Sequence, residues 1–257
     1  MSTRHALAPD SVLAAEVRPS PNHGERREGR RPDMLVLHYT GMKSSADALA
    51  RLCDPTSEVS AHYLVREDGH ILQLVPEARR AWHAGAGAWA GDRDINSCSI
   101  GIEIVHPGHE GGLPPYPPRQ IEAVAALSGD IVGRWKIRPE RVLGHSDIAP
   151  DRKEDPGEIF PWSVLHEAGI GHWVAPVPVS AGRVFREGDQ GPSVEALQAM
   201  LAFYGYPIRL GGVFDAATAA VVTAFQRHFR QERVDGCADL STIATLKALI
   251  DSLPSRS

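Results

Sequence analysis

The sequence has few cysteines and no long hydrophobic run, and each absence excludes a class of protein. Its three cysteines, Cys53, Cys98 and Cys237, are far apart and odd in number. They predict neither a disulfide framework nor a cysteine-type zinc site. The first thirty-odd residues contain no apolar stretch typical of a signal peptide, and no transmembrane span is visible. We therefore expect a cytoplasmic protein, with the periplasm or cell envelope as the alternative.

The chain also lacks a surplus of basic residues. It has 27 lysines and arginines against 32 aspartates and glutamates, which gives a formal net charge of -5. A protein that holds a phosphate backbone needs the opposite balance, so the charge argues against a nucleic-acid partner. The apolar share of 42% is that of an ordinary globular protein with one large domain or two smaller ones.

The distribution of proline and of apolar residues predicts four segments. Residues 1–32 are polar and rich in arginine, and we expect a flexible, solvated arm. Residues 33–173 form the first domain. Residues 174–184 carry two prolines among small residues, which is the composition of a semi-rigid linker. Residues 185–252 show three stretches of helical spacing and no chemical cluster, which suggests a small binding module.

The first domain mixes strand-like runs with segments of helical spacing. An Asp-Gly turn at residues 68–69 joins two β-rich runs and predicts a hairpin. The other expected elements are strands at 34–37 and 99–105, and helices at 44–52, 118–131 and 162–170. We predict an α/β fold with a mixed central β-sheet flanked by helices, a cleft at one sheet edge, and a small three-helix C-terminal domain.

Glu103 is an unusual residue within the strand at 99–105. Alternation places three isoleucines on one face and puts Glu103 on the other, beside Gly101 and Val105. A carboxylate in the middle of a strand is unfavourable unless it opens onto a cleft or has a partner. Either Glu103 is functional, or this is the exposed face of an edge strand.

The loop at residues 144–157 concentrates chemically useful groups. His145 offers a nitrogen ligand, Lys153 an ammonium group and Asp155 a carboxylate. Asp155 precedes a proline and is biased to extended backbone, so Lys153 and Asp155 should project to the same side. The alternative is a solvated surface loop rich in aspartate and proline.

His38 follows a buried strand and could join this loop at a metal. His38, His145 and Asp155 around one Zn²⁺ leave the fourth tetrahedral position for water, which is typical of a hydrolytic zinc site. Glu103 is then a candidate general base, and Lys153 a candidate stabiliser of the oxyanion. Among twelve histidines, this ligand set is one of many possible choices.

A family resemblance narrows that choice. Residues from about 34 to 173 resemble the zinc-dependent N-acetylmuramoyl-L-alanine amidases of the type-2 amidase superfamily, relatives of the peptidoglycan recognition proteins. Five ordered blocks carry the resemblance: VLHYTG at 36–41, SAHYLVREDGHILQLV at 60–75, AWHAG at 81–85, INSCSIGIEI at 95–104 and GHSDIAPDRKEDPG at 144–157. The resemblance implies hydrolysis of the amide between the muramic acid lactyl group and L-alanine, in cell-wall turnover or recycling.

The same resemblance assigns roles to residues of this sequence. It matches His38, His145 and Asp155 to the metal ligands, Glu103 to the catalytic glutamate and Lys153 to the basic residue beside the metal. Four further residues lie in matching blocks near the expected cleft, and we assign them to substrate contact: Tyr39, Trp82, His83 and Asn96. For His62, in the same hairpin block, we expect a structural hydrogen bond.

The C-terminal segment resembles the three-helix peptidoglycan-binding domain. The matching stretches are REGDQGPSVEALQAML at 186–201, GGVFDAATAAVVTAFQRHF at 211–229 and VDGCADLSTIATL at 234–246. Asp215 replaces the usual glycine after the phenylalanine, which affects the expected ligand affinity more than the fold. Such a domain is typical of an enzyme that acts on polymeric cell wall or large fragments of it. The missing export signal instead indicates recycling of muropeptides inside the cell.

Three alternatives to this function remain open from the sequence. The chain could be a non-catalytic peptidoglycan recognition module of the same fold, or a hydrolase that cuts a different stem-peptide bond. A purely structural zinc is disfavoured, because a closed site needs a fourth protein ligand. The expected partner is peptidoglycan or a muropeptide, and we expect a monomer.

Overall fold

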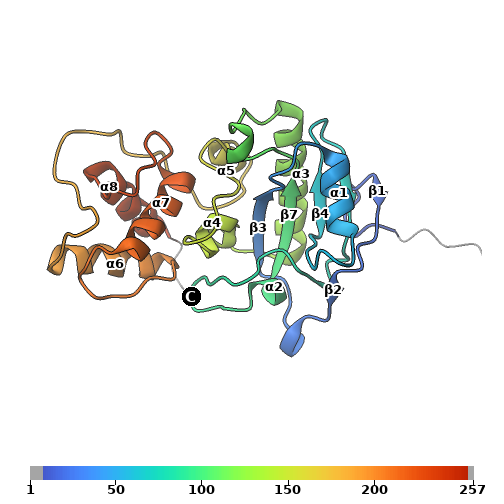
Figure 1. The fold of residues 1–257 in the computed structure, drawn as a ribbon, viewed down its shortest axis with the longest axis horizontal. Coiled ribbons are helices and arrows are strands. Elements are labelled where there is room, and N and C mark those ends of the chain that lie inside the picture. The colour runs from blue at the N-terminus through green and yellow to red at the C-terminus, as the bar shows by residue number, and fades with distance from the viewer. Residues whose placement is uncertain (1–7, 254–257) are drawn as a thin grey trace, which may run out of the picture.

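A six-stranded mixed sheet forms the centre of the first domain in the computed structural model, which describes residues 8–253 (Figure 1). The strands follow the order β1-β5-β4-β7-β3-β8, and only the β4–β5 pair is antiparallel. Their bounds are β1 Glu16–Val17, β3 Met34–Tyr39, β4 Tyr63–Val65, β5 Ile71–Gln73, β7 Ser99–Ile104 and β8 Val142–Gly144. The predicted mixed sheet and its hairpin are therefore confirmed.

Helices on both faces of this sheet explain its apolar strands. α3 (Pro118–Trp135) packs on one face against residues that include Leu35 and Ile102, and α1 (Ser45–Cys53) packs on the other against Leu64. Strands that are covered on both faces carry continuous apolar runs, as residues 34–37 do. α1 begins after the capping residue Ser44, whose side chain accepts a hydrogen bond from the Asp47 N–H.

The remaining elements of the first domain are short. They are β2 His23–Gly24, β6 Arg80–Ala81, η1 Arg27–Gly29, α2 Ile95–Cys98, η2 His109–Gly111, η3 Pro139–Arg141, α4 His145–Ile148 and α5 Trp162–Glu167. β2 and β6 form a separate two-stranded sheet. α4 directly follows β8, so this edge strand leads into the loop at 144–157 that carries His145 and Asp155.

The prediction of a flexible arm is wrong for residues 8–32. β1 pairs with β5 at the edge of the large sheet, and β2 pairs with β6. Arg26 is buried and donates to backbone carbonyls of Glu77, Ser97 and Ser99. These carbonyls satisfy a guanidinium that we expected to be solvated. Residues 1–7 of the predicted arm lie outside the described residues.

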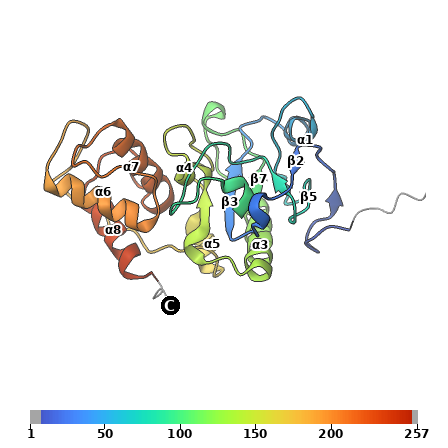
Figure 2. The ribbon, with the colours of Figure 1, turned by 90° about the horizontal axis from the view of Figure 1, so that it is seen from below.

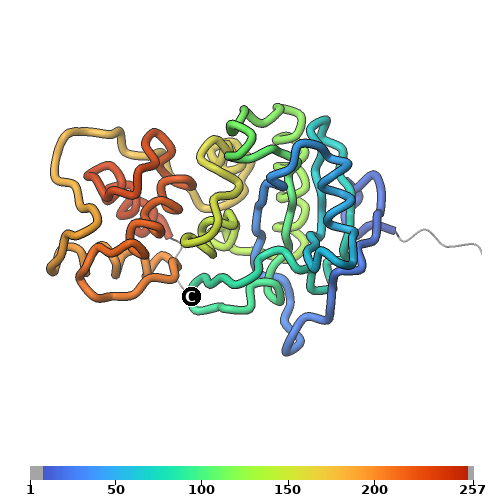
Figure 3. The backbone as a smooth tube through the Cα atoms, viewed as in Figure 1, coloured from blue at the N-terminus to red at the C-terminus, as the bar shows by residue number. Residues whose placement is uncertain are grey.

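The C-terminal domain consists of three helices, as predicted: α6 Pro192–Tyr204, α7 Ala216–Phe229 and α8 Leu240–Asp251. Asp215 caps α7 by accepting from the Thr218 N–H, and Asp239 caps α8 in the same way through Thr242. Figure 3 traces the proline-containing connection around the outer side of the bundle to α6. Ser241 and Thr245 of α8 hold this connection by hydrogen bonds to the backbone of Val177.

The helical bundle lies against the end of the sheet where α4 is located. Two views at right angles place α4 between the bundle and β3 (Figures 1 and 2). The aromatic core of the bundle is continuous with buried residues of the first domain, among them Trp89 and Ile148. Among the helices of residues 8–253, none combines the length and hydropathy that crossing a bilayer requires.

Candidate active site

Two central strands deliver the first functional side chains to one end of the sheet. β3 and β7 are parallel neighbours, and their register sets His38 directly beside Glu103. Glu103 is also in register with Leu64 of β4, which packs against α1. Residues in register on neighbouring strands share a face, so both side chains point to the face that α1 partly covers. β7 lies between β4 and β3, so Glu103 is not on an edge strand. The cleft therefore lies where the carboxyl ends of the central strands β7 and β3 meet the loop that follows the outermost strand β8.

His38, His145 and Asp155 form a compact, buried cluster. The His38 Nδ1 and His145 Nδ1 atoms are 2.9 Å apart, and they lie 3.1 and 3.0 Å from Asp155 Oδ2. His145 comes from the start of α4 and Asp155 from the loop that follows α4. Two imidazole nitrogens and one carboxylate oxygen that face one another in this way are a suitable donor set for a divalent cation.

A chain of hydrogen bonds leaves the His38 Nδ1 atom free of a proton. Ser99 donates its hydroxyl hydrogen to the Ile95 carbonyl, so its Oγ accepts from His83 Nε2–H at 3.0 Å. The His83 Nδ1 atom must then be the acceptor of the 2.9 Å bond from His38 Nε2–H. His38 consequently turns an unprotonated Nδ1 toward Asp155 and His145, which is the tautomer that binds a metal.

A backbone carbonyl sets the tautomer of His145. The His145 Nε2 atom lies 3.0 Å from the Ala84 carbonyl oxygen, which can only accept a hydrogen bond. The proton of the neutral ring is therefore on Nε2, and Nδ1 keeps its lone pair for a metal. The sequence AWHAG at 81–85 thus supports both histidines, through His83 on one and Ala84 on the other.

The electrostatics of the cluster favour a neutral His38 and an ionised Asp155. Burial, and next the neighbouring His145, lower the pKa of His38 to about 4. Burial alone raises the pKa of Asp155, but the charge and hydrogen bonds of His145 and His38 outweigh it and hold the pKa well below its ordinary value. Metal ligation needs these protonation states, because only the lone pairs of unprotonated groups can bind a cation.

Glu103 is the unsatisfied carboxylate of the site. Its Oε2 atom is buried and has no hydrogen-bond partner in the described part of the chain. Burial raises the pKa of Glu103 well above its ordinary value, and the charge of Asp155 raises it further, while Lys153 opposes both. A carboxylate kept in this state beside a candidate metal site has the proton affinity that a general base requires.

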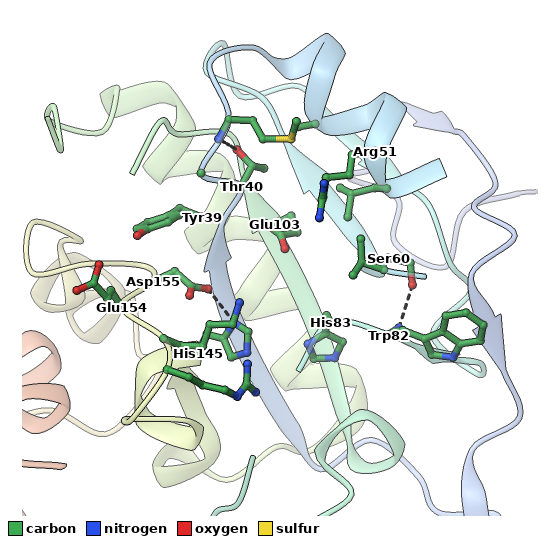
Figure 4. Close-up of a pocket in the computed structure, with 17 residues that line it drawn as sticks. Tyr39, Thr40, Arg51, Ser60, Trp82, His83, Glu103, His145, Glu154 and Asp155 are labelled. Atoms are coloured by element: carbon green, nitrogen blue, oxygen red, sulfur yellow. Dashed lines mark hydrogen bonds and ion pairs between the residues drawn. The ribbon is translucent and has the colours of Figure 1, made fainter. Parts of the chain in front are cut away.

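A cleft of about 540 Å³ opens above these groups (Figure 4). Its lining includes Glu103, His145, Lys153 and Asp155, so Lys153 and Asp155 face the same cleft. Figure 4 places His145 and Asp155 at one side of the cleft, Trp82 at the other and Glu103 between them.

The residues that we assigned to substrate contact differ in their positions. Tyr39 and Trp82 line the cleft and are half-buried, and His83 lies at its floor. Asn96 is buried and is not among the lining residues. Its Oδ1 accepts hydrogen bonds from the backbone N–H groups of His83 and Ala84. Asn96 therefore holds the segment that supports both candidate histidine ligands.

His62 and Gly101 support the floor from below. His62 Nδ1 accepts from the Gly101 N–H at 2.9 Å, and its Nε2 lies 3.1 Å from the Arg79 carbonyl, which confirms the structural role predicted for this histidine. A Cβ atom at Gly101 would lie 2.5 Å from the His83 ring. Glycine at this position lets the His83 ring lie flat on β7, within reach of His38.

Sequence reasoning missed two arginines that line the cleft, Arg51 on α1 and Arg152 in the loop after α4. Arg152 donates to the carbonyls of Ala84 and Ala86 and so ties the loop to the floor. The Arg51 side chain has no ion-pair or hydrogen-bond partner among residues 8–253. Figure 4 shows its guanidinium directed into the cleft. The spacing of α1 predicts only that Arg51 is off the apolar face, which is typical of any solvated residue.

Comparison with protein families identifies both parts of the chain. The family described as "N-acetylmuramoyl-L-alanine amidase" matches residues 28–158, and "Putative peptidoglycan binding domain" matches residues 190–246. The first match contains all five residues of the predicted metal and catalytic set.

Two individual relatives match different shares of the chain. The chain is 40% identical over 230 residues to N-acetylmuramoyl-L-alanine amidase AmiD of Escherichia coli, covering 85% of this chain and 82% of AmiD. It is 37% identical over 166 residues to the 1,6-anhydro-N-acetylmuramyl-L-alanine amidase AmpD of Enterobacter cloacae, covering 58% of this chain and 86% of AmpD.

Solved structures resemble the fold described above. The complex of E. coli AmiD with the substrate anhydro-N-acetylmuramic acid-L-Ala-D-γ-Glu-L-Lys has a TM-score of 0.74 at 37% identity, covering 91% of this chain and 92% of that chain. AmpDh3 of Pseudomonas aeruginosa in complex with anhydromuramic pentapeptide has a TM-score of 0.72 at 34% identity, covering 93% and 96%.

Proposed function

This chain belongs to the N-acetylmuramoyl-L-alanine amidase family, and on that premise we propose that it cuts the amide between the lactyl group of N-acetylmuramic acid and L-alanine. The substrate is peptidoglycan or a muropeptide, and the reaction serves cell-wall turnover. The observation that carries this proposal is the position of the Glu103 carboxylate, which lies unpaired in a cleft beside the cluster of His38, His145 and Asp155.

We propose zinc as the metal, with His38, His145 and Asp155 as its ligands. Two imidazoles and one carboxylate form a ligand set of catalytic zinc, which keeps a position open for water or substrate. The unprotonated Nδ1 atoms of both histidines, each backed by a hydrogen bond on Nε2, fit this ion. When bound, zinc supplies Lewis acidity, which acidifies water and polarises the amide carbonyl.

Glu103 moves the proton of the reaction. Its carboxylate accepts a proton from the attacking water, whose oxygen forms the new bond to the lactyl carbonyl carbon. As the carbon–nitrogen bond breaks, protonated Glu103 delivers that proton to the nitrogen of L-alanine. The products are the lactyl carboxylic acid of the sugar, which keeps the second proton of the water until it ionises in solution, and the free amine of the stem peptide.

Lys153 stabilises the negative charge that develops on the carbonyl oxygen. Exchanging Lys153 for methionine keeps most of the side-chain volume and removes the ammonium group. We expect kcat to fall by a factor of about 10² to 10³, with a small change in KM, because an oxyanion donor acts mainly in the transition state. Steady-state kinetics on a soluble muropeptide measure this, with Lys136→Met at an exposed site as the matched control. An unchanged kcat for Lys153→Met contradicts the assignment.

Arg51 recognises a carboxylate of the stem peptide. A γ-linked D-glutamate, as in the AmiD ligand, has a free α-carboxylate, and Arg51 offers an unpaired guanidinium across the cleft from Asp155. We expect about tenfold higher kcat/KM for a substrate with D-glutamate than for one with D-isoglutamine, since a charge-assisted hydrogen bond contributes about 1.5–3 kcal/mol.

The variant Arg51→Gln should lose this preference, and Arg119→Gln, at an exposed position on α3, should keep it. The ratio of kcat/KM for the two substrates is the measurement. Equal ratios in the wild type and in Arg51→Gln would show that Arg51 does not contact this carboxylate.

Tyr39 and Trp82 are our candidates for contact with the sugar or peptide, because both line the cleft. For His83 and Asn96 we propose a positioning role, since their polar atoms are engaged within the protein. We keep the domain boundaries as proposals: a zinc amidase domain at 33–173, a linker at 174–184 and a peptidoglycan-binding-like domain at 185–252. A monomer and a cytoplasmic location also stay predictions.

Product masses test the proposed reaction against the alternatives. Purified muropeptides are incubated with the protein, with protein and chelator, and with chelator followed by added zinc. We expect free stem peptides and peptide-free sugar, which disappear with chelator and return with zinc. Sugar that keeps L-alanine would indicate a different scissile bond, and intact muropeptides in every sample would indicate a recognition module.

A further inference from the structure

Asp147, two residues after His145, is a buried carboxylate that depends on the C-terminal domain. Its side chain is fully buried and accepts three hydrogen bonds. One comes from the Gly144 N–H of its own loop, at 2.7 Å. The other two come from the other domain, where the Tyr206 hydroxyl donates to Oδ1 at 2.6 Å and His228 Nδ1–H donates to Oδ2 at 2.7 Å.

Aromatic contacts fix both of these donors. The His228 ring is stacked between Trp162 of the first domain, at a centroid distance of 3.6 Å, and Phe229, at 3.8 Å. The Tyr206 ring meets Trp89 of the first domain edge-on at 4.9 Å. The Tyr206 ring also meets Phe225 edge-on at 6.4 Å. Since each ring has aromatic neighbours in both domains, the two donors are preorganised for the Asp147 carboxylate.

The other end of the same loop is also held by the C-terminal domain. Arg227, next to His228 on α7, lies 2.9 Å from the Glu154 carboxylate and 3.5 Å from that of Glu158. Gln231 donates to the Phe160 carbonyl at 2.8 Å. The C-terminal domain therefore contacts the chain on both sides of Asp155.

The loop passes these contacts directly to the metal cluster. The Ser146 N–H donates to the Asp155 carbonyl at 3.0 Å, so the segments that carry the two loop ligands are bonded to each other. Glu158 also accepts from His109 Nε2, and the Nδ1 of this histidine lies 2.9 Å from the Tyr39 hydroxyl in the cleft. A displacement of the loop would therefore move His145 and Asp155 together.

We propose that the C-terminal domain is a positioning part of the amidase site: Tyr206, Arg227 and His228 hold the loop at 144–160 so that His145 and Asp155 meet His38. This inference rests on the proposed metal site and adds a role for a domain whose family match suggests only wall binding. Two of the three hydrogen bonds to Asp147 cross the domain boundary, and without them a carboxylate in a dry interior keeps only the Gly144 N–H as a partner. The loop would then rearrange to reach water.

A domain that only binds the cell wall and a domain that positions the metal ligands predict different results. If the C-terminal domain only retained the enzyme on polymeric wall, defects at its interface would not affect a small soluble muropeptide or the affinity for the metal. A positioning domain affects both, because the geometry of the ligands changes. Metal affinity does not depend on wall binding or on turnover. A change in metal affinity in the interface variants therefore indicates a positioning role.

The test compares full-length variants that leave all ligands in place. In Tyr206→Phe/His228→Phe, the rings stay and both donors to Asp147 are lost. We expect a metal dissociation constant raised by about tenfold or more in chelator competition, a changed absorption spectrum with Co²⁺, and a similar loss of kcat/KM on soluble muropeptide. With Tyr206 unchanged, His228→Asn is compared with His228→Phe. The asparagine amide nitrogen can replace Nδ1, so His228→Asn should bind the metal more tightly than His228→Phe.

Gln198→Leu is the matched control for general destabilisation of the bundle. Gln198 is buried in α6, and its side-chain hydrogen bonds go to Gly211, Gly212, Val213 and Thr218, all within the C-terminal domain. It should lower Tm without changing metal affinity. If the double variant fails to fold, Tyr206→Phe, which removes one oxygen atom, is measured by itself.

Wild-type metal affinity and an unchanged Co²⁺ spectrum in the Asp147-contact variants would overturn the proposal, and so would an equal loss of affinity in Gln198→Leu. The outcome is separable from the proposed function. A wild-type protein that binds metal without cutting muropeptides refutes the reaction, whereas metal binding that is insensitive to the interface refutes only the positioning role.

Discussion

The substitution Glu103→Gln should lower kcat by a factor of about 10³ and leave metal content and substrate binding near the wild-type level. Glutamine has the shape of glutamate and cannot accept the proton of the attacking water, and general base catalysis is typically worth 10² to 10⁴ in rate. The buried carboxylate of Glu103 has a raised pKa and an unsatisfied oxygen, so its charge is held at a cost to stability. The neutral variant should therefore be at least as stable as the wild type.

Three measurements on one preparation establish this result: kcat on a soluble muropeptide, bound metal by elemental analysis, and Tm. Glu122→Gln, an exposed glutamate on α3, is the control and should behave as the wild type. Turnover in Glu103→Gln within tenfold of the wild-type rate would mean that another group accepts the proton. A lost metal would mean that Glu103 is part of the ligand set.

Asp155→Asn should weaken metal binding by about 10³ and abolish activity at ordinary zinc concentrations. The amide replaces an anionic ligand that lies about 3 Å from both imidazole Nδ1 atoms. Structural zinc in zinc-finger peptides binds with about 10–16 kcal/mol in total. On this scale we expect the loss of one of three ligands to cost about 4 kcal/mol, or about 10³ in affinity. We expect activity below detection at ordinary zinc concentrations, with partial recovery when zinc is in excess.

The loop itself offers the control for this prediction. Asp151→Asn removes an exposed carboxylate four residues earlier in the same loop and should change neither metal affinity nor rate. Chelator competition gives the affinity, and the rate is measured over a series of zinc concentrations. Stoichiometric, tightly held zinc in Asp155→Asn would place the metal elsewhere.

Local signals in the sequence predicted most of the first domain. The hairpin at 63–73 follows from an Asp-Gly turn between two β-rich runs, and α1 begins at the Ser44 cap. The buried run before His38 requires a strand that is covered on both faces. In each of these cases, the residues that determine the element lie within a few positions of one another.

Features that depend on distant parts of the chain were not predictable in this way. β1 has only two residues, and only its pairing with β5 makes it a strand, so the N-terminal segment looked like a flexible arm. The buried position of Arg26 likewise depends on carbonyls some 50 to 70 residues away. The N-terminal segment is polar and has no hydrophobic periodicity, so its sequence does not predict that it adds to the edge of the sheet.

The site shows the same division. Sequence blocks predicted the cluster of His38, His145 and Asp155, whose side chains the structure brings together. The orientation of Asn96 toward the backbone and of Arg51 toward the cleft depends on packing between separate elements. The contact of His228 with Asp147 depends on how two domains meet, which neither domain's motifs contain.

A crystal structure of zinc-loaded Glu103→Gln with an uncut muramyl tripeptide tests the central claim most directly. We predict anomalous scattering of zinc at one position, bonded to His38 Nδ1, His145 Nδ1 and Asp155 Oδ2. The amide between the lactyl group and L-alanine should lie at this ion, with residue 103 and Lys153 within hydrogen-bonding reach. Two results would contradict the proposed amidase mechanism. One is zinc bound by other residues, and the other is a different bond of the ligand at the ion in place of the lactyl amide.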